Sequence, residues 1–380
     1  MSKSAPLVIL SSSQTTELNR NNLYSFGGTH VAQANDTLLE VQGLKKYFPI
    51  QQGFLRKTVG YIKAVDDVNL TVKAGETLGV VGESGCGKTT MGRCLIRLYE
   101  PSGGKILLNV ENQTISVTEL SQKQMHIFRR NAQIIFQDPF SSLNPRMNLL
   151  ETIGEPLLVN GLARGRDLEE RVKEVVTQVG LRVEHLRRFP HSFSGGQRQR
   201  IGIARALVVH PKLIVADEPV SALDVSIQAQ ILNLLEDLQG KFNLTYIFIS
   251  HNMAVIRYIS DRIAVMYAGK MVELGSKHEL LSHPQHPYTE LLLAAVPRTV
   301  DRLRGQRTVT PGEPPDLGNL PQGCVFHPRC KYARERCKVE EPKLRALRPD
   351  YYVSCHFAEE LDLHGIDTPE RIRVPLTGVK

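Results

Sequence analysis

The first residues able to do chemistry form a glycine-rich loop, GESGCGKTT. The spacing G-x-x-x-x-G-K-[ST] is typical of loops that bind the phosphates of ATP or GTP, and here it lies between a predicted strand and a predicted helix. Glycines allow backbone N–H groups to converge on phosphate oxygens, and the start of the helix adds partial positive charge. Lys88 can reach the β- and γ-phosphates, and Thr89 offers a hydroxyl to Mg²⁺. The predicted nucleotide-binding residues of this loop are Gly82, Ser84, Gly85, Cys86, Gly87, Lys88, Thr89 and Thr90.

Two acidic residues that suit metal-dependent hydrolysis occur further along, in KLIVADEP. Asp217 and Glu218 come at the C-terminal end of an apolar strand, which is where ligands bind in open α/β sheets. We predict that Asp217 coordinates Mg²⁺ through water. Glu218, one residue on, is placed to orient and polarise an attacking water.

The elements that must position these residues alternate between strand and helix. ETLGVVGES, KLIVADEP and LTYIFISHN are short apolar runs that indicate buried strands, and TTMGRCLIRLY, 163–187 and 197–209 have helical patterns. This alternation predicts an α/β fold with a largely parallel sheet covered on both faces. TLLEVQGLKKYF is interpreted as an edge strand, and KILLNV with TISV as a hairpin.

Composition limits the class of protein. The 380 residues are 41% hydrophobic and 23% charged, which is typical of a globular chain with an ample core. No apolar run reaches 18 residues, and the N-terminal run LVIL is too short for a secretory signal, so we expect a cytoplasmic location. In that compartment six cysteines favour metal binding or buried thiols over disulfides. The net charge of +8 fits a solvated basic surface or a face turned to anionic lipid or nucleic acid, and charge alone does not separate these.

The chain divides by composition into five segments. Residues 1–36 are polar and predicted to be disordered, and residues 37–297 form the α/β domain. A linker rich in Pro and Gly covers 298–323. A Cys-rich segment at 324–357 and a tail at 358–380 complete the chain.

SFSGGQRQRIGIARAL, residues 192–207, resembles the signature of ABC-transporter ATPases, with Phe193 where the family usually has Leu. The resemblance covers nearly all of residues 37–296. It implies a P-loop ABC-type nucleotide-binding domain with a RecA-like core, an antiparallel β subdomain and a helical signature subdomain at about 138–197. In this family two subunits pair head to tail, and the signature of one caps the γ-phosphate held by the other. The signature residues implied to contact nucleotide are Ser194, Gly195, Gly196 and Gln197.

The remaining family motifs are also present. Gln137 in QIIFQDP matches the residue that ligates Mg²⁺ and senses the γ-phosphate, and Asp224 in SALD matches the loop that faces the partner subunit. His251 matches the switch histidine. Phe48 aligns with the aromatic residue that stacks on adenine, with Tyr47 as the alternative. The resemblance thus implies Glu218, His251 and Gln137 as catalytic residues, and Thr89, Gln137 and Asp217 as Mg²⁺ ligands.

Three further stretches are similar to dipeptide and oligopeptide permease ATPases: FQDPFSSLNPRM (136–147), HPQHPYTELLLAAVP (283–297) and GEPPDLGNLPQGCVFHPRC (312–330). This resemblance implies an ATP-hydrolysing subunit on the cytoplasmic face of the cell membrane that drives uptake of di- or oligopeptides. Its partners would be two transmembrane permease subunits, a second and usually non-identical ATPase subunit and, indirectly, a substrate-binding protein outside the membrane. Uptake of nickel, glutathione or oligosaccharides stays open as an alternative. A soluble ABC ATPase that acts on nucleic acid is a weaker one.

Four cysteines near the C-terminus follow the spacing C-x5-C-x6-C-x17-C, wider than the pairs of structural zinc sites. Ordering roughly thirty residues costs about 1–2 kcal/mol each in backbone entropy. The segment has few large apolar residues, so a metal centre contributing on the order of 10 kcal/mol would offset much of that cost. Members of the peptide-permease family carry a 4Fe–4S cluster in this region; zinc and metal-free packed thiols are the alternatives. The ligands implied by the resemblance are Cys324, Cys330, Cys337 and Cys355, with His327 and His356 in reserve.

Overall fold

The computed structural model describes residues 37–53, 56–110, 113–296, 312–313 and 315–366. The expectations for the N-terminal segment 1–36, for most of the 298–323 linker and for residues 367–380 lie outside these ranges.

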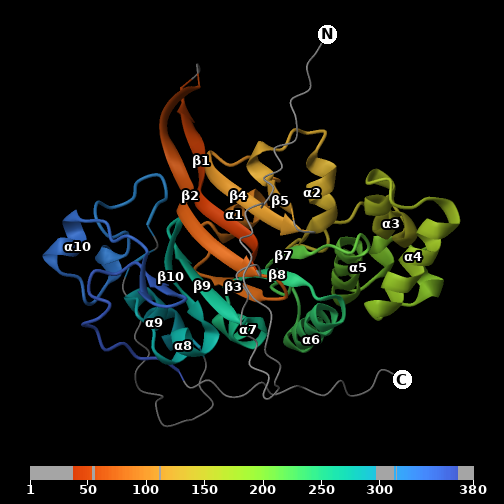
Figure 1. Ribbon diagram of the computed structural model, residues 1–380. Coiled ribbons are helices and arrows are strands. Elements are labelled where there is room, and N and C mark those ends of the chain that lie inside the picture. Colours follow the sequence, from red (N-terminus) through yellow and green to blue (C-terminus); the bar gives the residue numbers. More distant parts are fainter. Residues whose placement is uncertain (1–36, 54–55, 111–112, 297–311, 314, 367–380) are drawn as a thin grey trace, which may run out of the picture.

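An eight-stranded sheet forms the centre of the molecule, in the order β11-β12-β10-β9-β3-β8-β7-β6 (Figure 1). Its strands from β6 to β9 pair in parallel, and β10, β12 and β11 continue the sheet antiparallel. Every residue of β3, β7 and β8 is buried, as expected for strands covered on both faces. The strands are β3 (Thr77–Val81), β6 (Ala132–Ile135), β7 (Leu213–Asp217), β8 (Thr245–Ser250), β9 (Arg262–Tyr267), β10 (Lys270–Ser276), β11 (Arg345–Arg348) and β12 (Tyr351–Val353). The α/β fold with a largely parallel sheet is therefore confirmed.

Helices that pack on this sheet follow the strands in sequence. The first begins directly at the glycine-rich loop, and the others come from the second half of the chain. They are α1 (Lys88–Leu95), α6 (Val225–Phe242), α7 (Met253–Ile259), α8 (Lys277–Ser282) and α9 (Pro287–Ala294).

A second, antiparallel sheet has the order β2-β1-β4-β5, built from β2 (Lys57–Lys73), β1 (Thr37–Gln52), β4 (Gly103–Val110) and β5 (Gln113–Ser116). β1 pairs with β2 on one side and with β4 on the other, so the prediction that it is an edge strand is wrong. Alternation of polar and apolar residues shows that one face of a strand is solvated and does not reveal whether its edges are paired.

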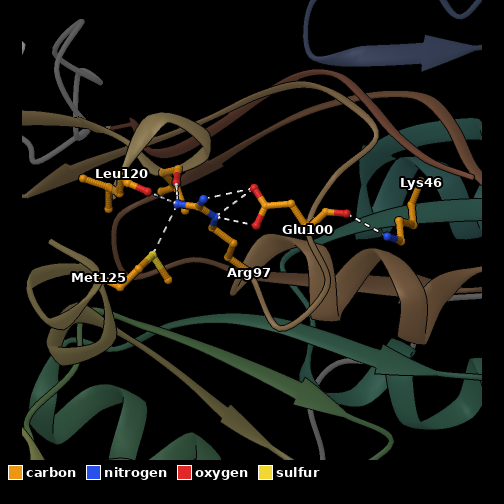
Figure 2. Close-up of polar contacts among 6 residues, drawn as sticks. Lys46, Arg97, Glu100, Leu120 and Met125 are labelled. Atoms are coloured by element: carbon orange, nitrogen blue, oxygen red, sulfur yellow. Dashed lines mark hydrogen bonds and ion pairs between the residues drawn. The ribbon is translucent and has the colours of Figure 1, made fainter. Parts of the chain in front are cut away.

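Arg97 ties the end of α1 to this antiparallel subdomain (Figure 2). Its guanidinium donates to the carbonyl of Leu120 at 2.5 Å and pairs with the Glu100 carboxylate, with Nε 2.9 Å from Oε2. The sulfur of Met125, at the start of α2 (Met125–Asn131), is 3.5 Å from the same guanidinium. Lys46 of β1 donates to the Glu100 carbonyl at 2.8 Å. The helix that follows the glycine-rich loop is thereby fixed to the strand that carries Phe48.

The helical subdomain contains α3 (Leu149–Val159), α4 (Gly165–Gln178) and α5 (Gly195–Leu207), with α3 packed against the other two. The helical pattern predicted over 163–187 corresponds to α4 and, beyond it, to a single 3-10 turn at Val183–His185. Gly180 has a positive φ of 72°, its N–H bonds the Thr177 carbonyl, and the N–H of Leu181 bonds the Val176 carbonyl. This Schellman arrangement ends the helix.

The Cys-rich segment joins the main sheet and does not form a separate lobe. β12 pairs with β10, with Glu273 opposite Val353 and Leu274 opposite Tyr352. Tyr351 is fully buried, and a Cβ on Gly275 would lie 2.4 Å from its ring. Figure 1 shows α10 (Glu335–Val339) of this segment and the helical subdomain at opposite ends of the molecule.

The chain just after the Cys-rich segment is also docked, since the N–H of Ile366 bonds the Leu281 carbonyl at 2.7 Å. None of the helices within the described ranges is long and apolar enough to cross a bilayer.

Candidate active site

The glycine-rich loop lies between β3 and α1 and closes around the Lys88 ammonium. A Cβ on Gly82 would lie 2.1 Å from the Met266 carbonyl oxygen, and one on Gly87 2.0 Å from that of Ala64. Gly87 also has a φ of 106°, so only glycine fits there. Lys88 is 4% exposed, and its Nζ donates to the carbonyls of Gly82 at 2.8 Å and Glu83 at 2.7 Å. A backbone ring with a buried ammonium at its centre is suited to hold the terminal phosphates of a nucleotide.

Asp217 ends β7 beside this loop. The Thr89 hydroxyl donates to its Oδ1 at 2.8 Å. Oδ2 is buried with no hydrogen-bond partner, and Nε of Arg93 is 4.0 Å away. Burial raises the pKa of the Asp217 carboxyl, with the Thr89 hydrogen bond and Arg93 acting against that shift. An unpartnered carboxylate oxygen next to a hydroxyl is a donor set that fits Mg²⁺.

Glu218 is contacted by both of the other predicted catalytic residues. Its Oε2 accepts from Nε2 of Gln137 at 3.0 Å and is 3.0 Å from Nδ1 of His251. The three residues follow β6, β7 and β8, whose carboxyl ends meet at one edge of the sheet. Glu218 has a φ of 47°, a left-handed conformation that is costly for a residue with a side chain and recurs at functional sites.

The signature residues lie at the start of α5. Ser194 is the N-cap, its Oγ accepts from the N–H of Gln197 at 3.3 Å, and Oε1 of Gln197 accepts from the N–H of Ser194 at 3.0 Å. A Cβ on Gly196 would lie 2.7 Å from Ile227 of α6, the helix whose N-cap position is Asp224. The signature and Asp224 are therefore neighbours.

The signature and the glycine-rich loop have different neighbours in this chain. The helix α5 packs mainly against α3, with further contacts to β6, α4 and α6, whereas Gly82 and Gly87 lie against Met266 and Ala64. Ser194 and Gln197 are exposed. One chain thus presents two half-sites that are apart from each other.

Phe48 and Tyr47, the two residues predicted as alternatives for stacking on adenine, have different partners. The Tyr47 hydroxyl donates to the Asp66 carboxylate. Phe48 meets Tyr99 edge-on, with ring centroids 5.8 Å apart, and Nζ of Lys46 lies 4.9 Å above the Phe48 ring. The stacking role stays a prediction for Phe48, with Tyr47 as the alternative.

Two contacts to Glu83, inside the loop, are not predicted from sequence spacing. Arg329, from the Cys-rich segment, donates to both Glu83 carboxylate oxygens, and the Tyr288 hydroxyl accepts from the N–H of Glu83 at 2.8 Å. The only sequence signal is indirect: Tyr288 and Arg329 belong to the HPYT and FHPRC stretches of the peptide-permease resemblance.

The four C-terminal cysteines line one cavity of about 20 Å³, together with His327 and His356. Burial raises the pKa of Cys324 to about 12 and that of Cys355 to about 11, and the neighbouring thiols add to both shifts. Within the described part of the chain, no three His, Cys, Asp or Glu side chains come together closely enough to hold one metal ion. The geometry therefore supports neither of the two predicted metal centres, zinc or the 4Fe–4S cluster, and the ligand role of the four cysteines stays a prediction.

Comparisons with known proteins agree with this geometry. The sequence profile described as "ABC transporter" matches residues 65–221, and the one described as "Oligopeptide/dipeptide transporter, C-terminal region" matches residues 272–337. The chain is 52% identical over 328 residues to the oligopeptide transport ATP-binding protein AppF of Bacillus subtilis, a match that covers 86% of this chain and 98% of the relative. It is 44% identical over 327 residues to the dipeptide transport ATP-binding protein DppF of Haemophilus influenzae, again covering 86% and 98%.

Solved structures match the ATPase domain. The ATP-binding cassette MJ0796, a dimer in a post-hydrolysis state with ADP and Pi, has a TM-score of 0.55 and 28% identity, covering 63% of this chain and 99% of that one. CbiO1 from Clostridium perfringens has a TM-score of 0.54 and 26% identity, covering 65% and 91%. This chain therefore belongs to the ABC transporter family, among the ATP-binding proteins of oligopeptide and dipeptide transporters.

Proposed function

We propose that this protein hydrolyses ATP to ADP and phosphate as the ATPase subunit of an importer of di- or oligopeptides. The observation that carries the proposal is the convergence of Gln137 and His251 on Glu218, beside a glycine-rich loop that encloses Lys88. The names of the relatives, which are oligopeptide and dipeptide transport proteins, support the substrate class. Nickel, glutathione, oligosaccharide and nucleic-acid functions gain no support from them.

Hydrolysis in this site is a matter of positioning and charge neutralisation. The loop N–H groups and Lys88 bind the terminal phosphates. Thr89, Asp217 and Gln137 would hold Mg²⁺, which neutralises negative charge on the phosphates. Glu218 accepts a hydrogen bond from the attacking water and orients it, while Gln137 and His251 keep the carboxylate in place.

Completion of the site requires a second ATPase subunit. The signature consists of Ser194 and Gln197, which are exposed, and Gly195 and Gly196, which are partly exposed. It is free to cap the phosphates bound by a partner's loop, and Asp224 adjoins it. The MJ0796 cassette is a dimer in its solved structure, which supports a pair here. We propose that the two ATPase subunits are non-identical, as is usual among the dipeptide and oligopeptide permease ATPases that this chain resembles.

Exposed apolar side chains on the helical subdomain support docking to two transmembrane permease subunits at the cytoplasmic face of the membrane. Phe140 is 59% exposed and Val159 75%, with Leu158 and Phe189 also exposed. Contiguous apolar patches on a surface mark interaction sites, and all four side chains belong to the helical subdomain. A substrate-binding protein outside the membrane would act on this subunit only through the permeases.

The four cysteines are proposed to hold a 4Fe–4S cluster with a structural role. All four thiols line one cavity, and four thiolates are the usual ligands of such a cluster. At about 20 Å³ the cavity has room for about one water, so the thiols would have to move apart around a cluster. Metal-free packing is the competing outcome. Anaerobically purified protein that absorbs in the visible range and contains iron and sulfide would support the cluster, and colourless, iron-free protein would refute it.

The function is tested by co-expressing the chain with the permease and ATPase genes adjacent to its own. Co-purification with two apolar chains, and ATP hydrolysis stimulated by peptide and binding protein, would support it. Tight, salt-sensitive binding to DNA without permease association would instead favour the nucleic-acid function.

A further inference from the structure

Glu83 is the one acidic side chain within the glycine-rich loop, and it is held at three points. Its N–H donates to the Tyr288 hydroxyl at 2.8 Å, and its carbonyl accepts from Lys88 at 2.7 Å. Its two carboxylate oxygens accept from Arg329 at 2.8 and 2.9 Å. A loop that must bind a triphosphate thus carries a negative charge of its own, and a single arginine from outside the loop pairs with it.

Arg329 is itself well fixed. Its side chain is 8% exposed, against 26% for Glu83, so the pair is largely shielded from solvent. The guanidinium lies 5.8 Å from the Tyr267 ring and 5.9 Å from the Phe326 ring. Those two rings contact Tyr288 at centroid distances of 4.5 and 5.4 Å, so three aromatic rings form one cluster against the Arg329–Glu83 ion pair.

The same C-terminal segment is also linked to β2, the strand that pairs with the one carrying Tyr47 and Phe48. Lys270 bridges Glu341 at 2.5 Å and Asp66 at 3.0 Å, and Asp66 accepts from the Tyr47 hydroxyl. The segment therefore contacts the loop directly at Glu83 and is linked to Asp66 of the antiparallel subdomain through Lys270 of β10.

We propose that Arg329 is a positioning residue for ATP binding: it neutralises Glu83 and holds its carboxylate back from the incoming phosphates, so that ATP affinity depends on this arginine of the docked Cys-rich segment. The proposal rests on the ATPase function above. Without the guanidinium, the Glu83 carboxylate would face the incoming phosphates as an unpaired charge in a poorly solvated loop. Chemistry at Glu218 would be untouched, because Arg329 contacts none of the groups around it.

The test uses the full chain in its assembled transporter and compares KM for ATP with kcat. R329Q is expected to raise KM about tenfold and to leave kcat within about twofold, since only binding loses a favourable charge pair. E83Q removes the repelling charge and is expected to bind ATP within about threefold of wild type. R334Q is the matched control, because Arg334 lies in the same segment and pairs with Glu360 away from the loop.

The double variant E83Q/R329Q separates a charge effect from simple loss of docking. With neither charge present, KM is expected to return close to that of E83Q. A double variant with KM as high as R329Q, or an unchanged KM in R329Q, would overturn the proposal. If R329Q fails to fold, the KM values for ATP of E83Q/R329Q and E83Q are compared instead. Equal KM values would support the proposal, and a tenfold difference would refute it. Wild-type protein that binds no ATP would instead refute the ATPase function itself.

Discussion

Glu273 offers a quantitative prediction about how the Cys-rich segment is joined to the ATPase sheet. This carboxyl is completely buried on β10, where it accepts from the Tyr351 hydroxyl and the Gln285 N–H, both at 2.5 Å. Burial raises its pKa from 4.5 to about 7. The folded protein therefore keeps a proton that the unfolded chain releases between these values, so this group makes stability fall as pH rises through that window.

Between pH 5 and pH 8 the two titrations give a loss of about 2.5 kcal/mol from Glu273 alone. His286 acts in the opposite sense, because burial lowers its pKa to about 3. Between pH 3 and about pH 6.5 the unfolded chain binds a proton at this imidazole that the folded protein does not bind, so this group makes stability rise with pH. Because the two effects cancel over much of the range, the wild-type curve alone is uninformative. The difference between wild type and E273Q isolates the carboxyl, since the amide does not titrate.

The measurement is urea unfolding of wild type and E273Q at a series of pH values, followed by far-UV circular dichroism because the chain has no tryptophan. The stability advantage of wild type over E273Q is expected to fall by about 2.5 kcal/mol from pH 5 to pH 8. E184Q removes a carboxyl from an exposed position and serves as the control. A constant difference between wild type and E273Q across this range would refute the protonated state assigned to the buried carboxyl.

Three further changes test the site and the junction. E218Q should retain ATP binding and lose at least about a hundredfold in phosphate release, because the water loses its hydrogen-bond acceptor; turnover near the wild-type rate would contradict the assignment. G87A should abolish nucleotide binding in a fluorescence titration, since its Cβ would meet the Ala64 carbonyl at 2.0 Å, and unchanged affinity would contradict the loop geometry. Y351F removes a donor from a buried carboxyl and should lower the free energy of unfolding by about 1–3 kcal/mol; a thermally neutral variant would argue against that hydrogen bond.

The convergence of Gln137 and His251 on Glu218 could be anticipated from sequence because the three residues share one geometric rule. Gln137, Glu218 and His251 each follow an apolar strand, and the carboxyl ends of parallel strands meet at one edge of a sheet. The same reasoning failed for the β1 edge, since side-chain alternation reports the faces of a strand and says nothing of its hydrogen-bonded sides. It also could not find the pairing of β12 with β10, because two short strands separated by a linker carry no register signal in their composition.

Glu83 and Arg329 are 246 positions apart in the sequence. Glu83 belongs to the predicted phosphate-binding loop and Arg329 to a stretch similar to peptide-permease ATPases, and neither motif predicts a contact with the other. In one chain the signature and the glycine-rich loop have different neighbours. Among the described residues, the Cys-rich segment contacts the loop at Glu83 and lies at the opposite end of the molecule from the helical subdomain (Figure 1). In a head-to-tail pair each nucleotide is held by the loop of one chain and capped by the signature of the other. It follows that the Cys-rich segment of a subunit acts on the nucleotide bound by its own loop and not on the one it caps. In a pair of non-identical subunits, each nucleotide is therefore influenced by a different C-terminal segment. A difference between the two segments would suffice to give the two sites different affinities for ATP.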